Sequence, residues 1–133
     1  IGDGTTRLDR WETALNEAGP GDPRDTSTPQ AMTRTLKRLL TGRVLSPASR
    51  DQLASWMMAC QTGGRRLRSG LPAGWRVGDK TGSGENGTTN DVAVAWPPGG
   101  RPLLICAFLT GARSDPPARE AALAEVARVA SGA

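Results

Sequence analysis

The first residue that indicates chemistry is a lysine at the end of a short apolar run, Lys80 in the segment WRVGDKTGSG, residues 75–84. The 17 basic residues include only two lysines, Lys37 and Lys80. An ammonium is a compact charge with three donors, whereas a guanidinium is a planar fork. A lysine followed by Thr-Gly-Ser-Gly therefore suggests a chemical role. The alternative is a strand end that runs into a glycine turn.

A carboxylate in an irregular N-terminal stretch is the second candidate group. Glu12 follows Trp11, and a carboxylate against an indole can have a raised pKa and act as a proton shuttle. Asn16 lies four residues further on and reaches the same side if this stretch makes one helical turn. The alternative interpretation of Glu12 is a helix-start or surface charge.

The residue types exclude several other chemistries. The chain has no histidine, so Ser-His-Asp and Cys-His catalysis from its own residues is excluded. Its two cysteines, Cys60 and Cys106, each lie in an apolar segment and are expected to be buried free thiols. Two cysteines without histidine do not form a zinc site, so we expect no metal and no cofactor. Acid-base chemistry must then use Asp, Glu or Lys.

The net charge of +4 and the pI near 10 raise the possibility of nucleic-acid binding. However, the arginines are spread along the chain, apart from the cluster at residues 65–68, and aromatic residues are few. A solvated basic surface without a nucleic-acid partner is therefore expected. No apolar stretch is long enough for a membrane span, so no membrane partner is expected either.

The elements that must position these groups begin with a long loop over residues 1–28. Residues 28–42 then predict a helix, because Thr28 can cap it, Pro29 suits its first position and Gly42 can end it. The same pattern recurs from Ser46, with Gly63 as the expected stop. The apolar residues on one face of each helix are expected in the core: Met32, Leu36, Leu39 and Leu40; and Leu53, Trp56, Met57 and Cys60.

The period changes in the second half, where three strands are expected. They are residues 75–80, residues 91–96, and an almost continuous apolar run at 101–110, which predicts a strand buried on both faces. The turn Pro-Pro-Gly-Gly at 97–100 joins the last two as an antiparallel hairpin. A terminal helix follows, with three residues expected to face inward: Leu123, Val126 and Ala130.

The predicted fold class is α+β, with a three-stranded antiparallel meander flanked by helices. We divide the chain into a loop at residues 1–28, an all-helical part at 29–63, and the sheet with its terminal helix at 74–133. A buried strand needs cover on both faces, and the chain opens without methionine in mid-loop. These two features suggest a processed or truncated product that lacks a partner segment.

Taken together, the motifs identify a family. The stretches TRLDRWE, LNEAGPGDPRDTSTPQAM, GDKTGSG and GTTNDVAVAWPP resemble the C-terminal half of the class A serine β-lactamases, nearly from end to end. The Lys-Thr-Gly triplet alone is shared with penicillin-binding proteins, but the triplet combined with the loop glutamate and asparagine is specific. The resemblance implies the β-lactamase and transpeptidase-like fold and an active-site omega loop at residues 1–28.

The resemblance implies a role for each candidate residue. Glu12 would be the general base for a water that hydrolyses the acyl-enzyme, and Asn16 would help hold that water. Lys80 would tune the electrostatics beside the nucleophile. Thr81 and the Ser83 hydroxyl would contact the substrate carboxylate, while Gly82 leaves room for the substrate along the strand edge.

Further roles follow from the same resemblance. The Ser83 N–H would be one oxyanion donor, whose loss typically costs about 10²–10³ in rate. Some members carry a carboxylate-binding arginine at the position held here by Thr89, and others carry it before the strand. We therefore expect that Arg66, not Arg68, binds the substrate carboxylate. Arg10 and Asp25 would pair across the neck of the loop.

The family's Ser-x-x-Lys nucleophile motif and its Ser-Asp-Asn element do not occur in these residues. The chain alone is therefore not expected to hydrolyse a β-lactam, and its expected partners are β-lactam antibiotics and an N-terminal half of the same enzyme; otherwise we expect a monomer. The alternatives are a penicillin-binding or sensor domain that does not hydrolyse, and an inactive fragment. By analogy with the family, the expected location is secreted or periplasmic, with a role in antibiotic resistance.

Overall fold

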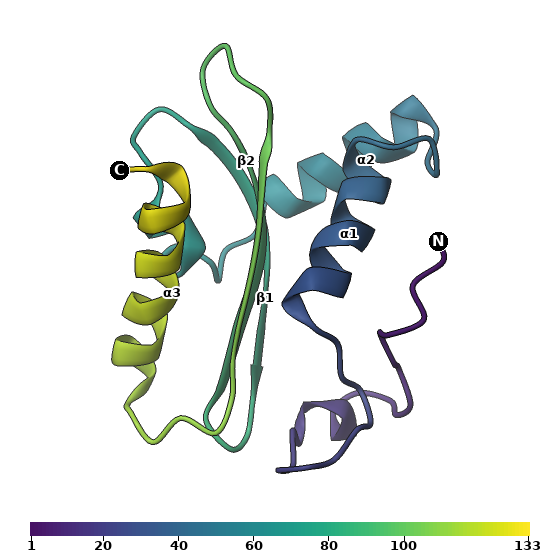
Figure 1. Ribbon diagram of the computed structural model, residues 1–133, viewed down its shortest axis with the longest axis vertical. Helices are drawn as coiled ribbons and strands as arrows, with labels where there is room; N and C mark the ends of the chain where they lie inside the picture. Colours follow the sequence, from purple (N-terminus) through teal and green to yellow (C-terminus); the bar gives the residue numbers. More distant parts are fainter.

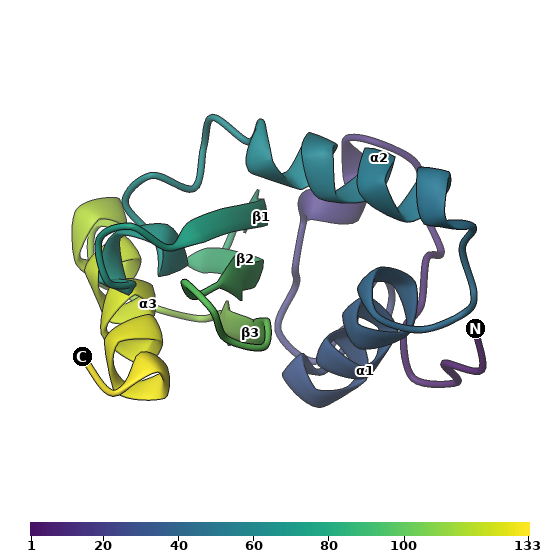
Figure 2. The same cartoon turned by 90° about the horizontal axis from the view of Figure 1, so that it is seen from above.

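The computed structural model describes residues 1–133 as three layers with an irregular segment at one end (Figure 1). Helix α3 covers one face of the sheet, and helices α1 and α2 cover the other (Figure 2). The elements in chain order are η1 (Ala14–Asn16), α1 (Pro29–Leu40), α2 (Pro47–Met58), η2 (Leu67–Gly70), β1 (Arg76–Gly84), β2 (Thr88–Trp96), β3 (Leu103–Leu109) and α3 (Pro116–Ser131). The predicted α+β class with an antiparallel meander is confirmed.

The helices begin where their caps predict. The Thr28 hydroxyl accepts a hydrogen bond from the Ala31 N–H at 3.1 Å, and Ser46 does the same for the Ser49 N–H at 3.2 Å. Helix α2 ends at Met58, however, five residues before the expected stop at Gly63. Gly63 instead packs against a strand, because a Cβ atom there would lie 1.7 Å from an Asp79 carboxylate oxygen.

The sheet has the strand order β1-β2-β3, and both pairings are antiparallel. Strand β1 extends to Gly84 rather than stopping at Lys80, because Ser83 pairs with Thr89 and Gly84 with Thr88. The segment Lys-Thr-Gly-Ser is therefore strand backbone, not the turn that the alternative interpretation of this stretch required.

Two small cores hold the layers together. One lies between the sheet and α3, with Ala93, Ile105, Leu123 and Ala127, and the other lies between the sheet and α1 and α2, with Leu36, Leu40, Met57 and Val94. Strand β2 is the central strand and contains the most buried positions. The expectation that β3 is buried on both faces is wrong, because only Ile105 and Ala107, which face α3, are buried in it.

Three inward assignments are also wrong. Trp56 is 67% exposed, because α2 contacts the sheet through Met57 and the neighbouring Trp56 side chain lies on a different side of the helix. Val126 is 45% exposed and Ala130 is exposed, whereas Ala124 and Ala127 are buried beside Leu123. Small residues thus face the sheet and let α3 pack closely. No helix is both long enough and apolar enough to cross a membrane.

Candidate active site

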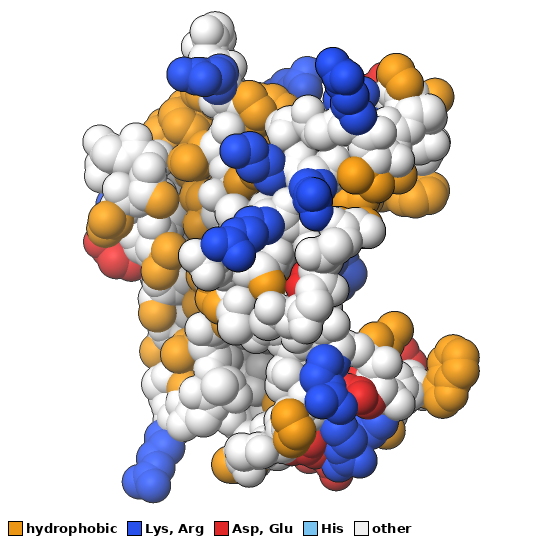
Figure 3. Space-filling model, turned by 45° about the vertical axis from the view of Figure 1, so that its right-hand side comes forward, with side chains coloured by type: hydrophobic (Ala, Val, Ile, Leu, Met, Phe, Trp, Pro, Cys, Tyr) orange, Lys and Arg blue, Asp and Glu red, His pale blue; other side chains and the backbone are white.

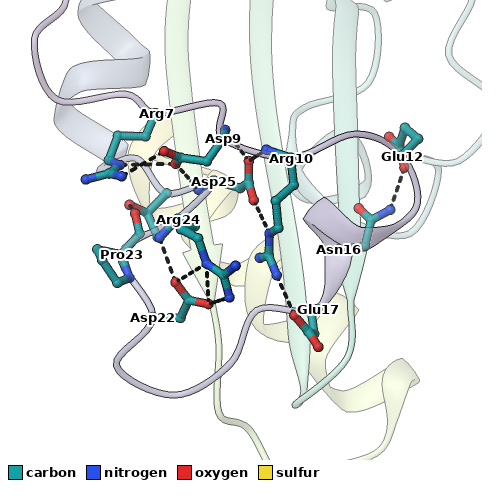
Figure 4. Close-up of polar contacts among 11 residues, drawn as sticks. Arg7, Asp9, Arg10, Glu12, Asn16, Glu17, Asp22, Pro23, Arg24 and Asp25 are labelled. Atoms are coloured by element: carbon teal, nitrogen blue, oxygen red, sulfur yellow. Dashed lines mark hydrogen bonds and ion pairs between the residues drawn. The ribbon is translucent and has the colours of Figure 1, made fainter.

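Paired charges hold the loop at residues 1–28 closed at its neck (Figure 4). Arg10 Nε donates to Asp25 Oδ2 at 2.6 Å, and the Asp25 Oδ1 atom accepts from the Asp9 and Arg10 N–H groups at 2.6 and 3.0 Å. Arg10 also pairs with Glu17. The Arg10 and Asp25 side chains are only 13% and 4% exposed. The predicted pairing of Arg10 with Asp25 is confirmed.

Local ion pairs flank the neck. Arg7 pairs with Asp9 at 2.7 Å, and Arg24 pairs with Asp22 at 2.6 Å. The Arg10 guanidinium lowers the pKa of Asp25, and the Arg7 guanidinium with the Asp25 N–H lowers the pKa of Asp9 to about 2. These carboxylates are therefore ionised at neutral pH. Figure 3 shows charged side chains of both signs gathered on this segment, at the lower right.

Glu12 and Asn16 lie together at the end of the loop opposite Arg7 and Arg24 (Figure 4). Between them the chain makes one 3-10 turn, Ala14–Asn16, and Asn16 Nδ2 donates to Glu12 Oε2 at 2.7 Å. Both residues therefore reach the same side, as the sequence predicted. Trp11 is 90% exposed, so its indole does not cover the carboxylate, and that part of the prediction is wrong. The Glu12–Thr13 peptide bond is cis.

The loop contacts the end of β1 directly. The Glu85 N–H donates to the Asn16 carbonyl at 3.1 Å, and Asn86 Nδ2 donates to the Glu17 carbonyl at 2.9 Å. Gly84 permits this contact, because a Cβ atom at this position would lie 2.4 Å from the Asn16 carbonyl oxygen. The backbone of β1 thus fixes the position of Asn16, and Asn16 in turn holds the Glu12 carboxylate.

The candidate binding residues of β1 alternate between the two faces of the sheet. Lys80 is exposed, and its Nζ donates to the Thr81 carbonyl at 2.5 Å. The Thr81 hydroxyl shares a hydrogen bond of 2.5 Å with Thr62. Beside Gly82, a Cβ atom would meet only Asn90, at an ordinary contact distance of 3.6 Å. The strand edge at Gly82 therefore has free space.

Arg66 is buried against the same strand. Its Nη1 donates to the Gly82 and Asn90 carbonyls at 2.9 and 2.8 Å, and its Nη2 donates to Ser83 Oγ at 2.7 Å. Arg68 instead pairs with the buried Asp79. The structure thus brings Arg66, and not Arg68, to Ser83. Contact between Arg66 and a substrate carboxylate stays a prediction.

A cavity of about 580 Å³ lies between the loop and the sheet. Asn16, Gly82 and Ser83 line it together with the apolar side chains of Met32 and Phe108. Glu12 and Lys80 are not among its lining residues. The structure therefore connects Asn16 with Ser83 across one cavity, while a cavity shared by Glu12 and Lys80 stays a prediction.

Sequence reasoning missed several residues at this site. Glu120 of α3 lies 3.6 Å from the Arg66 guanidinium, and no local pattern signals a contact so distant in sequence. Asp79 and Asp91 are 1% and 0% exposed. The sequence could have predicted this burial, because residues two apart on a strand share a face, and the apolar Val77 and Ala93 lie two residues from Asp79 and Asp91. No group of three or more possible metal ligands occurs.

Comparison with known proteins matches this geometry to a family. Residues 1–132 match the β-lactamase enzyme family, so the chain belongs to that family. Beta-lactamase AST-1 of Nocardia asteroides is 53% identical over 97% of this chain and 42% of its own length. Beta-lactamase OXY-1 of Klebsiella oxytoca is 50% identical, over 97% of this chain and 44% of its own length.

Solved structures give the same result. The last common ancestor of Gram-negative bacteria (GNCA4) class A β-lactamase superposes with a TM-score of 0.94 at 63% identity. That match covers 96% of this chain and 49% of the ancestral chain. The predicted resemblance to class A β-lactamases is confirmed, and this chain spans about half the length of the relatives it matches.

Proposed function

We propose that this chain forms the deacylating loop and the substrate strand of a class A serine β-lactamase. One observation carries the proposal: Asn16 holds the Glu12 carboxylate at 2.7 Å on a loop whose backbone is bonded to the end of the Lys-Thr-Gly-Ser strand. A carboxylate beside an amide can hold a water molecule between them. In this proposal, that water attacks an ester formed on the side of the strand.

The proposed reaction has two steps. A serine hydroxyl, supplied by an N-terminal half of the enzyme, attacks the β-lactam carbonyl, and the C–N bond breaks as the ring nitrogen takes a proton. Glu12 then takes a proton from the water, which attacks the ester carbonyl; as the ester C–O bond breaks, Glu12 returns the proton to the serine oxygen. The Ser83 N–H is one donor to the developing oxyanion.

Binding of the substrate is assigned to the strand. In this proposal Lys80 and Thr81 of the edge strand β1 bind the substrate carboxylate together with Ser83, whose hydroxyl accepts a hydrogen bond from Arg66. Gly82 leaves space for the substrate to lie along the strand. We propose that Arg66 adds positive charge at this position, because the residue at the alternative arginine position, Thr89, is buried and neutral.

The test combines this chain with an N-terminal half that carries Ser-x-x-Lys and follows nitrocefin hydrolysis. Hydrolysis only in the mixture, with rapid release of product, is the expected result. Covalent labelling without turnover would instead indicate a penicillin-binding or sensor domain, and no labelling would indicate an inactive fragment. Arg66→Ala in the reassembled enzyme should raise KM for penicillins several-fold, and unchanged kinetics would reject its assignment.

Other properties of the whole enzyme belong to the same proposal. We propose a secreted or periplasmic enzyme that contributes to antibiotic resistance, with the loop at residues 1–28 as its omega loop and with no partner besides the N-terminal half. Fractionation of the producing cells and the minimal inhibitory concentration of a penicillin with and without the gene would test these points.

A further inference from the structure

Two buried carboxylates, one on the substrate strand β1 and one on its neighbour β2, have no role in the proposed reaction. Asp79 of β1 and Asp91 of β2 are 1% and 0% exposed. In the antiparallel register Asp79 is opposite Ala93 and Asp91 is opposite Thr81, so the two acids are offset by two residues. Such diagonal neighbours on adjacent strands point to the same face, and the charge of Asp79 acts on Asp91. This face is the one that η2 and α3 cover.

Their hydrogen bonds leave one oxygen of each acid without a partner. Asp79 Oδ1 accepts from Arg68 Nε at 2.8 Å, and Asp91 Oδ2 accepts from the Leu67 N–H at 3.2 Å. Asp79 Oδ2 and Asp91 Oδ1 are buried and accept no hydrogen bond. Unpaired buried polar atoms are rare in native proteins, and two adjacent buried negative charges are strongly unfavourable. A single proton between the two acids removes both problems.

We propose that Asp79 and Asp91 share one proton at neutral pH, carried by Asp91 and donated to Asp79, and that this acid pair positions Arg66 against Ser83. The acid pair holds the two residues that follow Arg66, since the Leu67 N–H bonds to Asp91 and the Arg68 guanidinium bonds to Asp79. Arg66 in turn donates to the Ser83 hydroxyl. Asp79 and Asp91 are thus positioning residues, not catalytic ones.

The surroundings of the acid pair favour one retained proton. Burial, together with the negative charge of Asp79, raises the pKa of Asp91 to about 7, while the Leu67 N–H and Arg66 oppose this rise. On the face of the acid pair, Arg68 of η2 pairs with Asp79, whereas Cys106 of β3 pairs with Val92 and lies on the opposite face of the sheet. Arg66 pairs with Glu120 of α3 at 3.6 Å, so that carboxylate balances its charge. Arg68 is then the one cation left to balance the two aspartates.

Loss of the shared proton has a defined consequence. Above the pKa of Asp91, a second negative charge appears beside the first, and the bond between the two acids is lost. The segment at residues 66–68 is then no longer held in one position, and the Arg66 contact with Ser83 weakens. If Ser83 binds the substrate carboxylate, as the proposed function states, KM should rise with pH around neutrality while kcat changes little.

The direct test does not depend on hydrolysis. Aspartate is labelled with carbon-13 at the side-chain carboxyl in the assembled enzyme, and the carboxyl signals are followed by NMR as pH changes. One signal should titrate near neutral pH, should vanish in Asp91→Asn and should persist in Asp51→Asn, whose carboxyl is exposed on α2. If no aspartate of the wild type titrates near neutral pH, or if the neutral signal survives Asp91→Asn, the proposal is overturned.

The functional arm, which rests on the proposed function, uses the same variants. In Asp91→Asn the amide donates permanently to Asp79, so the rise of KM between about pH 6 and pH 8 should disappear relative to the wild type and Asp51→Asn. A rise that persists unchanged in Asp91→Asn would overturn the positioning role. Absence of all hydrolysis would refute only the proposed function. The NMR titration of the wild type tests whether the acid pair shares a proton, and it needs neither activity nor a variant.

Discussion

Replacing Gly84 by alanine tests how closely the loop must approach the substrate strand. In the wild type, the Asn16 carbonyl oxygen occupies the space that a side chain on Gly84 would fill. In Gly84→Ala the new Cβ atom would lie 2.4 Å from that oxygen. Both atoms belong to the backbone or are bonded directly to it, so neither can turn away.

The size of the effect follows from this distance. An ordinary contact of about 3.5 Å between carbon and oxygen requires the Asn16 backbone to retreat by about 1 Å. That shift weakens the hydrogen bond from the Glu85 N–H, now 3.1 Å long, and carries Asn16 and Glu12 away from the strand. A displacement of about 1 Å in a catalytic group can cost about 10²-fold in rate.

The assay is single-turnover kinetics of a penicillin in the enzyme assembled from this chain and an N-terminal half. Deacylation should slow by about 10²-fold in Gly84→Ala, with a much smaller change in acylation, because the role proposed for Glu12 and Asn16 is to activate the deacylating water. Gly64→Ala is the matched control, since a Cβ atom at Gly64 meets nothing within 4 Å. Equal deacylation rates in Gly84→Ala and the wild type would refute the argument that the loop must lie this close.

Two further predictions concern stability. The pKa values of Asp25 and Asp9 are lowered, so the folded loop binds protons at these carboxylates less tightly than the unfolded chain does. The two ionised carboxylates therefore stabilise the fold fully above about pH 4. This stabilisation is lost as the pH falls toward the folded pKa of Asp9, about 2. The protection factors of the loop amides, which correct for the slower intrinsic exchange at low pH, should accordingly fall on acidification. Asp25→Asn should show low protection already at pH 7, and high protection in that variant would contradict the role of the Arg10 pair. Leu123→Ala should lower the free energy of unfolding by about 2–5 kcal/mol in denaturant titrations. Val126→Ala should lower it by under about 1 kcal/mol, because Val126 is 45% exposed. Equal losses in the two variants would contradict the observed orientation of α3.

Local rules predicted much of the fold. Thr28 and Ser46, each before a proline, marked two helix starts, because these side chains accept the free N–H groups of the first turn, and Asp115 caps α3 in the same way. Alternation and the turn at residues 97–100 marked the strands. The Lys80 stretch was found because lysine is rare in this chain. The Glu12–Asn16 pair was found because four-residue spacing over one turn brings side chains together.

The features that the sequence did not predict depend on how each helix or strand packs against its neighbours. The apolar stripe of α2 includes both Trp56 and Met57, and only the docking angle on the sheet decides that Met57 is buried and Trp56 is 67% exposed. The inward face of α3 is likewise decided by close packing of Ala124 and Ala127. Glu120 reaches Arg66 from across the chain, and sequence spacing contains no information on such a contact.

The most direct test of the central claim is the fate of the acyl-enzyme when Glu12 loses its charge. The assembled enzyme and its Glu12→Gln variant are mixed with a penicillin, and intact protein mass is followed over time. Glu125→Gln is the control, since that carboxylate pairs with Arg128 on the exposed face of α3. We predict that Glu12→Gln accumulates a stable adduct of substrate mass, while the wild type and the control release product. Turnover of Glu12→Gln at the wild-type rate, without an adduct, would contradict the account.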